Sequence, residues 1–221
     1  MPALKIDLYS DIICPWCIIG QHRLDKVLSE RFCGLDIDIE HHPYELMPQA
    51  PPEGLRLEDY FRQKGISDAK AAFARPEGEA RASGLHLELS RQPFVYRTVR
   101  AHTLLRAARN RGTQHVLSTA LMAAFFHEQR NISDHNTLVD IASRHGFSPE
   151  EADAILRSGA EQTLTENEIR KARVSGITSV PTFRIGTVTI VGGRTEDEIA
   201  SAIHEELRLT RGSSIPRAGT L

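Results

Sequence analysis

The sequence predicts an α/β fold in which a mixed central sheet with flanking helices is interrupted by a large all-helical insertion. Three observations support this prediction. Residues 1–40 show a strand, helix and strand pattern, a long stretch with helical periodicity follows, and strand patterns return only near residue 176. Since the second group of strands must complete the sheet that the first group begins, the intervening helices are expected to lie outside that sheet.

The first part of the chain is typical of a β-α-β unit. Residues 4–9 and 35–40 each alternate apolar and polar side chains, as half-buried strands do. Between them, apolar residues recur with helical spacing over residues 18–28. We expect this helix to begin just after Cys14, because Pro15 has the fixed φ and the missing N–H that suit a first helical position.

The segment from Leu55 to Ala172 has few strand signals and repeated helical ones. Four prolines between residues 43 and 52 precede it and break the strand pattern. Ser148-Pro149-Glu150-Glu151 combines a capping box with proline at the first helical position, which predicts a helix that ends at Gly159. The spacing predicts further helices over residues 58–64, 69–83, 98–109, 115–129, 137–145 and 161–175.

The last part of the chain predicts a β-hairpin and a terminal helix. Strand character runs over 176–185 and resumes over 188–191, and Thr195 to Glu198 is a second capping box. The helix after it carries Ile199, Ile203 and Leu207 on one face. The predicted domains are a discontinuous sheet domain of residues 1–45 and 173–210, a helical insertion domain of residues 46–172, and a flexible tail of residues 211–221.

Cys14-Pro15-Trp16-Cys17 lies between the first strand and the first helix and predicts a redox-active site. Two thiols three residues apart at a helix start place the first sulfur over unpaired N–H groups and the positive end of the helix dipole, which stabilise a thiolate. Cys14 is therefore the predicted nucleophile and the more exposed thiol. Cys17, one turn further along, is the predicted resolving thiol. Trp16 has no ionisable group and so adds no charge that would stabilise the thiolate further.

Other interpretations of the two cysteines have less support. A zinc site needs four ligands, and the chain has one further cysteine, Cys33, so His41 or His42 would have to complete the set. We predict no metal. A structural disulfide between Cys14 and Cys17 would close too small a loop to stabilise the fold much. Cys33 is expected to be a partly buried, inert thiol, and His41 and His42 to be structural imidazoles near the end of the second strand.

Composition and charge exclude several classes of partner. The net charge is −2 and hydrophobic residues make up 40% of the chain, which is ordinary for a globular protein and favours neither nucleic acid nor an anionic membrane. No signal peptide and no run of 18 apolar residues is present. We therefore expect a cytoplasmic protein with no membrane or nucleic-acid partner.

Several segments together resemble a known family. They are Ser10-Asp11-Ile12-Ile13 followed by the two cysteines, Pro43-Tyr44-Glu45-Leu46, Pro51-Pro52-Glu53-Gly54, and Gly176-Ile177-Thr178-Ser179-Val180-Pro181. In this order they resemble the thioredoxin fold of the DsbA-like family, in the branch with FrnE-type thiol-disulfide oxidoreductases and 2-hydroxychromene-2-carboxylate isomerases. The resemblance covers nearly the whole chain.

The resemblance implies a site and an activity. It implies a cis peptide between Val180 and Pro181, with the backbone of Val180 facing the active-site sulfur. Substrate-binding residues would then be Val180, Pro181, Pro15 and Trp16, beside the catalytic Cys14 and Cys17. The expected enzyme is a DsbA-like protein disulfide oxidoreductase or isomerase that cycles its own dithiol against protein or small-molecule thiols and disulfides, with no cofactor.

A glutathione-dependent isomerase or a kappa-class glutathione transferase is the alternative function. Such relatives usually carry serine where Cys14 stands and an Asn-Thr pair ahead of Ala-His, whereas this chain has Arg97-Thr98 before Ala101-His102. Both departures argue against glutathione as an activated cosubstrate. A chaperone with a hydrophobic cleft and a homodimer formed through the insertion are further hypotheses, and the sequence identifies neither the substrate nor the direction of electron flow.

Overall fold

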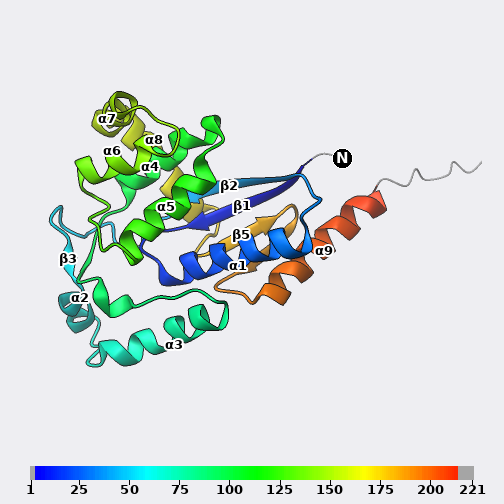
Figure 1. Ribbon diagram of the computed structural model, residues 1–221, viewed down its shortest axis with the longest axis horizontal. Coiled ribbons are helices and arrows are strands. Elements are labelled where there is room, and N and C mark those ends of the chain that lie inside the picture. The colour runs from blue at the N-terminus through cyan, green and yellow to red at the C-terminus, as the bar shows by residue number, and fades with distance from the viewer. Residues whose placement is uncertain (1–2, 214–221) are drawn as a thin grey trace, which may run out of the picture.

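A four-stranded mixed sheet forms the centre of the computed structural model, which describes residues 3–213 (Figure 1). The strands are β1 (Leu4–Ser10), β2 (Ile37–Pro43), β5 (Thr182–Ile185) and β6 (Val188–Val191), in the spatial order β2-β1-β5-β6. β1 runs parallel to β2, with Leu4 opposite Ile37, and antiparallel to β5. The first and last parts of the chain therefore share one sheet, as predicted.

Helices α1 (Pro15–Arg31) and α9 (Glu196–Ser213) lie side by side and pack on this sheet (Figure 1). Their apolar side chains and those of β1 and β5 form the sheet core. Its fully buried members include Ile6, Leu24, Phe183 and Ile203. Thr195 and Glu198 form the predicted hydrogen bonds at the start of α9.

The segment between β2 and β5 is largely helical, as predicted. In Figure 1 its residues 57–82 lie below α1, and its later helices lie at the upper left, beyond β2. Its helices are α2 (Leu57–Gln63), α3 (Ala69–Ala82), α4 (Val99–Ala108), α5 (Gln114–Phe126), α6 (His135–Ser143), α7 (Pro149–Arg157) and α8 (Gly159–Val174), with short 3-10 turns η1 (Leu89–Arg91) and η2 (Arg109–Arg111). Both hydrogen bonds of the Ser148–Glu151 capping box are present at the start of α7.

A second hydrophobic cluster, the insertion core, joins these helices to the loop after β1. It contains Leu104, Leu121 and Phe125 together with Ile12 and the two active-site cysteines. α4, α5 and α8 also contact β2. The insertion is thus packed directly against the active-site end of α1, and its separation into a domain of its own stays a prediction.

Three predicted boundaries were wrong, and one pair of short strands was missed. Gly159 begins α8 and does not separate two helices, because Ser158 caps the new helix through a hydrogen bond from the N–H of Glu161. Residues 176–181 form a loop, and strand pairing begins at Thr182. Two short strands, β3 (Leu55–Arg56) and β4 (Phe94–Val95), pair within the insertion. α9 extends to Ser213 into the predicted tail, whose remaining residues lie outside the described part of the chain.

Candidate active site

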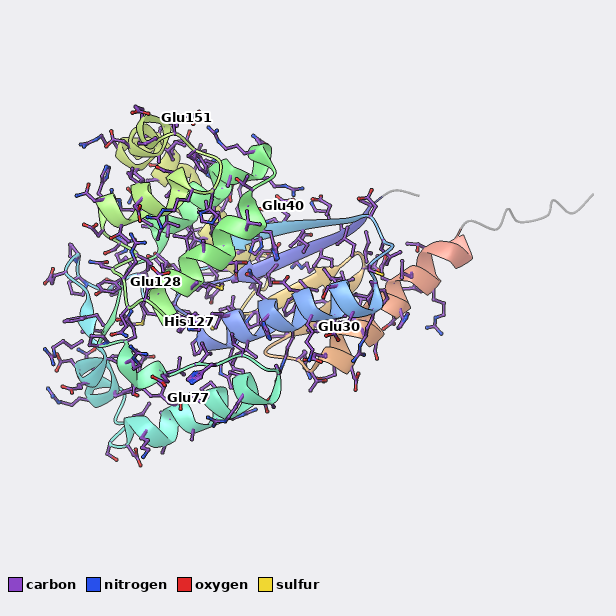
Figure 2. The ribbon with its side chains drawn as sticks, viewed as in Figure 1. Glu30, Glu40, Glu77, His127, Glu128 and Glu151 are labelled. Atoms are coloured by element: carbon purple, nitrogen blue, oxygen red, sulfur yellow. The ribbon has the colours of Figure 1, made fainter. Side chains whose placement is uncertain are left out.

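Cys14 caps the N-terminus of α1 and Pro15 occupies the first helical position. The Cys14 backbone is extended, with φ of −85° and ψ of 117°, and its carbonyl accepts hydrogen bonds from the N–H groups of Cys17 and Ile18. This local geometry follows from the sequence, because proline supplies the φ of the first turn and lacks the N–H that would have no partner there. The site lies at the opposite end of α1 from Glu30, which is labelled in Figure 2.

Both thiols are free and buried. Cys14 is 4% exposed and Cys17 is fully covered, so Cys14 is the more accessible sulfur, but only by a small margin. The two thiols lie close enough for the charge state of one to affect the other. Burial is the main cause that raises the pKa of Cys17 well above its usual value, and the interactions with Cys14 raise it further. Cys17 is therefore held as a neutral thiol, as expected for a resolving residue.

The peptide between Val180 and Pro181 is cis, as the resemblance implied. The thiol of Cys14 donates to the carbonyl oxygen of Val180 across 3.8 Å, so two segments far apart in the sequence meet at the reactive sulfur. Gly20 on α1 makes room for the loop, because an added Cβ there would lie 3.0 Å from Cγ of Pro181. The structure thus brings Cys14, Cys17, Val180 and Pro181 together.

A groove of about 450 Å³ begins at Pro15 and Trp16 and runs between α1 and the insertion. Its walls are mostly apolar and include Phe125. The guanidinium of Arg75 lies 5.3 Å from the ring centroid of Trp16, within the range of a cation–π contact. Pro15 and Trp16 therefore border a concave surface next to the thiols.

Sequence reasoning assigned no role to two buried polar residues at this site, Asp11 and His102. Asp11 is fully buried, and its backbone N–H donates to Cys17 Sγ at 3.5 Å. One carboxylate oxygen accepts from the N–H of Leu46 at 2.7 Å, and the other lies 3.4 Å from Nε2 of His102. The only sequence signal for these two residues was their position. Asp11 lies three residues before Cys14, and His102 lies in the segment that differs from the glutathione-dependent relatives.

The other sequence candidates lie in different surroundings. His42 hydrogen-bonds Asp7 at 2.9 Å and stacks on Tyr9. His41 is buried and hydrogen-bonds His115 at 2.9 Å, and burial followed by the neighbouring His115 lowers its pKa well below the usual value. Cys33 is exposed, so the expectation of partial burial was wrong, because the chain leaves α1 there for a surface turn.

Asp7, Glu40 and His42 place three ligand-type atoms within 4.8 Å of one another on β1 and β2, and Glu40 is labelled in Figure 2. The ammonium of Lys5 already lies 3.3 Å from Asp7 and 2.8 Å from Glu40. A cation is thus supplied by the chain itself, and we assign this cluster no metal.

The family model for the DsbA-like thioredoxin domain matches residues 5–204. The chain belongs to this family. It is also 27% identical to the uncharacterized protein YwbO of Bacillus subtilis over 210 residues, which cover 92% of this chain and 98% of YwbO. Among the described residues, none of the helices is long and apolar enough to cross a membrane.

Solved structures of the family share the fold. A probable DsbA oxidoreductase, SCO1869 from Streptomyces coelicolor, superimposes with a TM-score of 0.82 at 24% identity and covers 98% of this chain and 94% of its own. A 2-hydroxychromene-2-carboxylate isomerase gives 0.70 at 14% identity, with 96% and 100% coverage. The cytosolic disulfide reductase DsbM of Pseudomonas aeruginosa, solved with glutathione, gives 0.64 at 18% identity, with 93% and 100% coverage. At these identities the likeness establishes the fold alone.

Proposed function

We propose that the protein is a thiol-disulfide oxidoreductase that cycles a Cys14–Cys17 dithiol and disulfide. The observation that carries the proposal is the arrangement of two free thiols at the start of α1, with the carbonyl of Val180 against the first of them. Cys14 occupies the start of the helix with its sulfur at the Val180 carbonyl, whereas burial raises the pKa of Cys17 and keeps that thiol protonated. Two cysteines with such different surroundings suit a nucleophile and a resolving thiol.

The reaction has two exchange steps. The Cys14 thiolate attacks one sulfur of a substrate disulfide, forms a mixed disulfide and releases the first substrate thiolate. Cys17 then attacks the Cys14 sulfur, which closes the Cys14–Cys17 disulfide and releases the second substrate thiolate. The substrate is reduced and the protein is oxidised, and the same steps in reverse oxidise a substrate dithiol.

The substrate would be a protein or a small molecule with an accessible disulfide or thiol. The cis-Pro loop and the groove support this, because an extended segment beside Cys14 would meet the backbone of Val180 and Pro181 on one side and Pro15 and Trp16 on the other. No cofactor besides the protein's own disulfide is required. DsbM, described as a cytosolic disulfide reductase, supports our proposal of a cytoplasmic location.

Reduction of insulin disulfides by the wild-type protein with a thiol reductant tests the proposal, together with the Cys14/Cys17 reduction potential. Cys14→Ser should abolish turnover, and Cys17→Ser should accumulate a mixed disulfide at Cys14 that gel electrophoresis without reductant detects. Cys33→Ser is the matched control and should turn over as the wild type does, because Cys33 is exposed and lies at the opposite end of α1. Full turnover by Cys14→Ser would contradict the proposal.

Glutathione-dependent isomerisation is the second candidate, because DsbM was solved with glutathione and an isomerase shares the fold. Glutathione-dependent relatives usually carry asparagine where this chain has Arg97, and Arg97 does not favour this candidate function. Arg97 is held by Glu45 at 3.2 and 3.3 Å, and the same carboxylate accepts from the N–H of Thr98. Glutathione-dependent conversion of a chromene carboxylate that persists in Cys14→Ser would support this candidate and displace the first.

A further inference from the structure

We propose that Arg23 is a positioning residue for substrate binding, because its buried guanidinium holds α3 and the segment of residues 192–194 against Trp16. Trp16 and residues of α3 line the groove beside the thiols. Arg23 thus sets the shape of the surface on which a substrate lies. The inference rests on the proposed oxidoreductase function and adds to it a residue that does not touch the sulfurs.

The guanidinium of Arg23 is enclosed between α1 and the end of α3. The side chain is 3% exposed. Nε donates to Oγ of Ser83 at 2.6 Å, and Nη2 donates to the carbonyl and the carboxylate of Glu79 at 3.1 and 2.6 Å. Ser83 is the C-terminal cap of α3, so a cation is bound at a helix end where unpaired carbonyls favour positive charge. These hydrogen bonds attach α3 to α1.

The third nitrogen of Arg23 binds the segment between β6 and α9. Nη1 donates to the carbonyls of Gly193 and Arg194 at 3.0 and 3.1 Å. The five N–H donors of the guanidinium therefore have five acceptors, and these lie on two segments that are far apart in the sequence. A lysine offers three donors at a single nitrogen and does not match this planar arrangement.

Both segments that Arg23 binds also contact Trp16. A Cβ added to Gly193 would lie 2.6 Å from Cε3 of the indole, so the glycine allows residues 192–194 to lie directly against Trp16. From α3, the guanidinium of Arg75 lies 5.3 Å from the centroid of the Trp16 ring. Arg23 follows Trp16 by two turns of α1 and lies on the same face of the helix, from which it fixes both neighbours of the indole.

The segment of residues 192–194 also supports the loop that faces Cys14. The N–H of Gly192 donates to the carbonyl of Pro181 at 2.7 Å. A shift of this segment therefore moves Trp16 and Pro181, which border the substrate surface on two sides. The hydrogen bonds of the sulfurs involve neither Arg23 nor its partners, because Cys14 contacts the carbonyl of Val180 and Cys17 contacts the N–H of Asp11.

The buried charge of Arg23 is better explained by positioning than by stability. Enclosing a guanidinium costs desolvation energy, and apolar side chains of similar size often stabilise a buried position as well or better. Among the described partners of Arg23, Glu79 alone carries an opposite charge, and its side chain is 41% exposed. What apolar side chains lack is five donors in a fixed plane, which bind two segments at once.

Trp16 is the one tryptophan of the chain, so intrinsic fluorescence reports its surroundings directly. Arg23→Lys keeps the positive charge but loses the planar set of donors. We expect acrylamide to quench the fluorescence of this variant more strongly than that of the wild type, and the emission maximum to move to longer wavelength. Both changes follow because the indole loses the contact with residues 192–194 and becomes more exposed to water.

Substrate binding should weaken in the same variant. The KM for insulin should rise by about tenfold, because the substrate must then order Trp16 and the Pro181 loop when it binds, while kcat stays within about twofold of the wild type. Alkylation of Cys14 by iodoacetamide should keep its wild-type rate, since this small reagent needs no groove. A slowed alkylation would mean that Arg23 acts on the sulfur and would overturn the inference.

Arg109→Lys is the matched control. Arg109 also joins two parts of the chain, since its guanidinium donates to the carboxylate of Asp38 at 2.6 and 2.7 Å and to the carbonyl of Ile39. None of these three residues lines the groove. The control should lower the melting temperature and leave the quenching of Trp16 and the KM unchanged. A raised KM in the control would show that destabilisation alone causes the effect and would overturn the inference.

An Arg23→Lys protein with a lowered melting temperature but wild-type quenching and KM would likewise overturn it, because Arg23 would then serve stability alone. If Arg23→Lys does not fold, Ser83→Ala takes its place, since it removes the acceptor of Nε and leaves the other bonds of the guanidinium. It should shift quenching and KM in the same direction by less, and no shift in either would contradict the inference. A wild-type protein that does not reduce insulin would refute the proposed function, whereas the quenching of Trp16 would still decide whether Arg23 positions it.

Discussion

The sheet core and the insertion core differ in how fully their buried polar groups are hydrogen-bonded. In the sheet core, the buried carboxylate of Glu206 accepts two hydrogen bonds from Thr187, at 2.9 and 2.6 Å. Within residues 3–213, the buried side-chain atoms that lack a partner are instead in the insertion or where it meets the sheet: Asp11 Oδ1, His41 Nδ1, Thr98 Oγ1, His102 Nε2 and Thr113 Oγ1. Buried polar atoms that lack hydrogen bonds lower the stability of the folded state. The comparison therefore indicates that the sheet core favours stability, whereas the region around the thiols keeps such atoms at a cost in stability.

The largest expected effect comes from a truncation in the sheet core. Ile203 on α9 is fully buried, so Ile203→Ala should lower the free energy of unfolding by about 2–5 kcal/mol through lost burial and a cavity. Urea denaturation measures the loss. Insulin reduction, followed in the absence of urea, should keep its wild-type rate. A changed rate of insulin reduction would show that the two cores are coupled and would contradict the comparison.

A second prediction concerns Gly20, which lies where α1 meets both cores. A Cβ at this position would be 3.0 Å from Pro181 and 3.1 Å from the Phe183 ring. Alanine gains about 1 kcal/mol of helix propensity, but overpacking against buried rings costs about 1–3 kcal/mol. Gly20→Ala should therefore destabilise the protein by up to about 2 kcal/mol and reduce insulin turnover, because the cis-Pro loop must shift away from Cys14. Gly34→Ala is the control, since no atom lies within 4 Å of its added Cβ.

The raised pKa of Cys17 predicts a loss of stability in alkaline solution. Above about pH 8.5 the unfolded chain releases the thiol proton while the folded protein retains it, so the unfolded state binds fewer protons. Stability then falls by up to about 1.4 kcal/mol per pH unit until the folded pKa is reached. Denaturation curves of the wild type and Cys17→Ala should diverge above pH 8.5. Parallel curves would show that the thiol is not held neutral.

The lowered pKa of His41 predicts a loss of stability in acidic solution. Its folded pKa is lowered, so below about pH 6.5 the unfolded chain binds a proton that the folded protein does not. The contribution of this group is present above pH 6.5 and is lost as pH falls, again by up to about 1.4 kcal/mol per pH unit. His41→Gln should show a flatter decline in stability between pH 6.5 and 5 than the wild type. His86→Gln, an exposed histidine, should decline as the wild type does.

The sequence alone determined the features that depend on neighbours along the chain. Alternation of side chains predicted β1 and β2, helical spacing predicted the long insertion, and capping residues predicted the starts of α7 and α9. The position of Cys14 and Pro15 at the start of α1 belongs to this class, because propensity and capping act within one turn. Two-residue strands such as β3 escaped prediction because so short a pairing leaves no periodicity.

Only the tertiary structure showed that His102 approaches Asp11, whereas the contact of Val180 with Cys14 was implied by the family resemblance and by no local pattern. Both contacts join residues that are far apart in the chain. Such contacts depend on how the helices pack on the sheet, which no local pattern records. Burial has the same origin: the sequence predicted a partly buried Cys33, but packing leaves Cys33 exposed, while it encloses Cys17 and raises the pKa of that thiol.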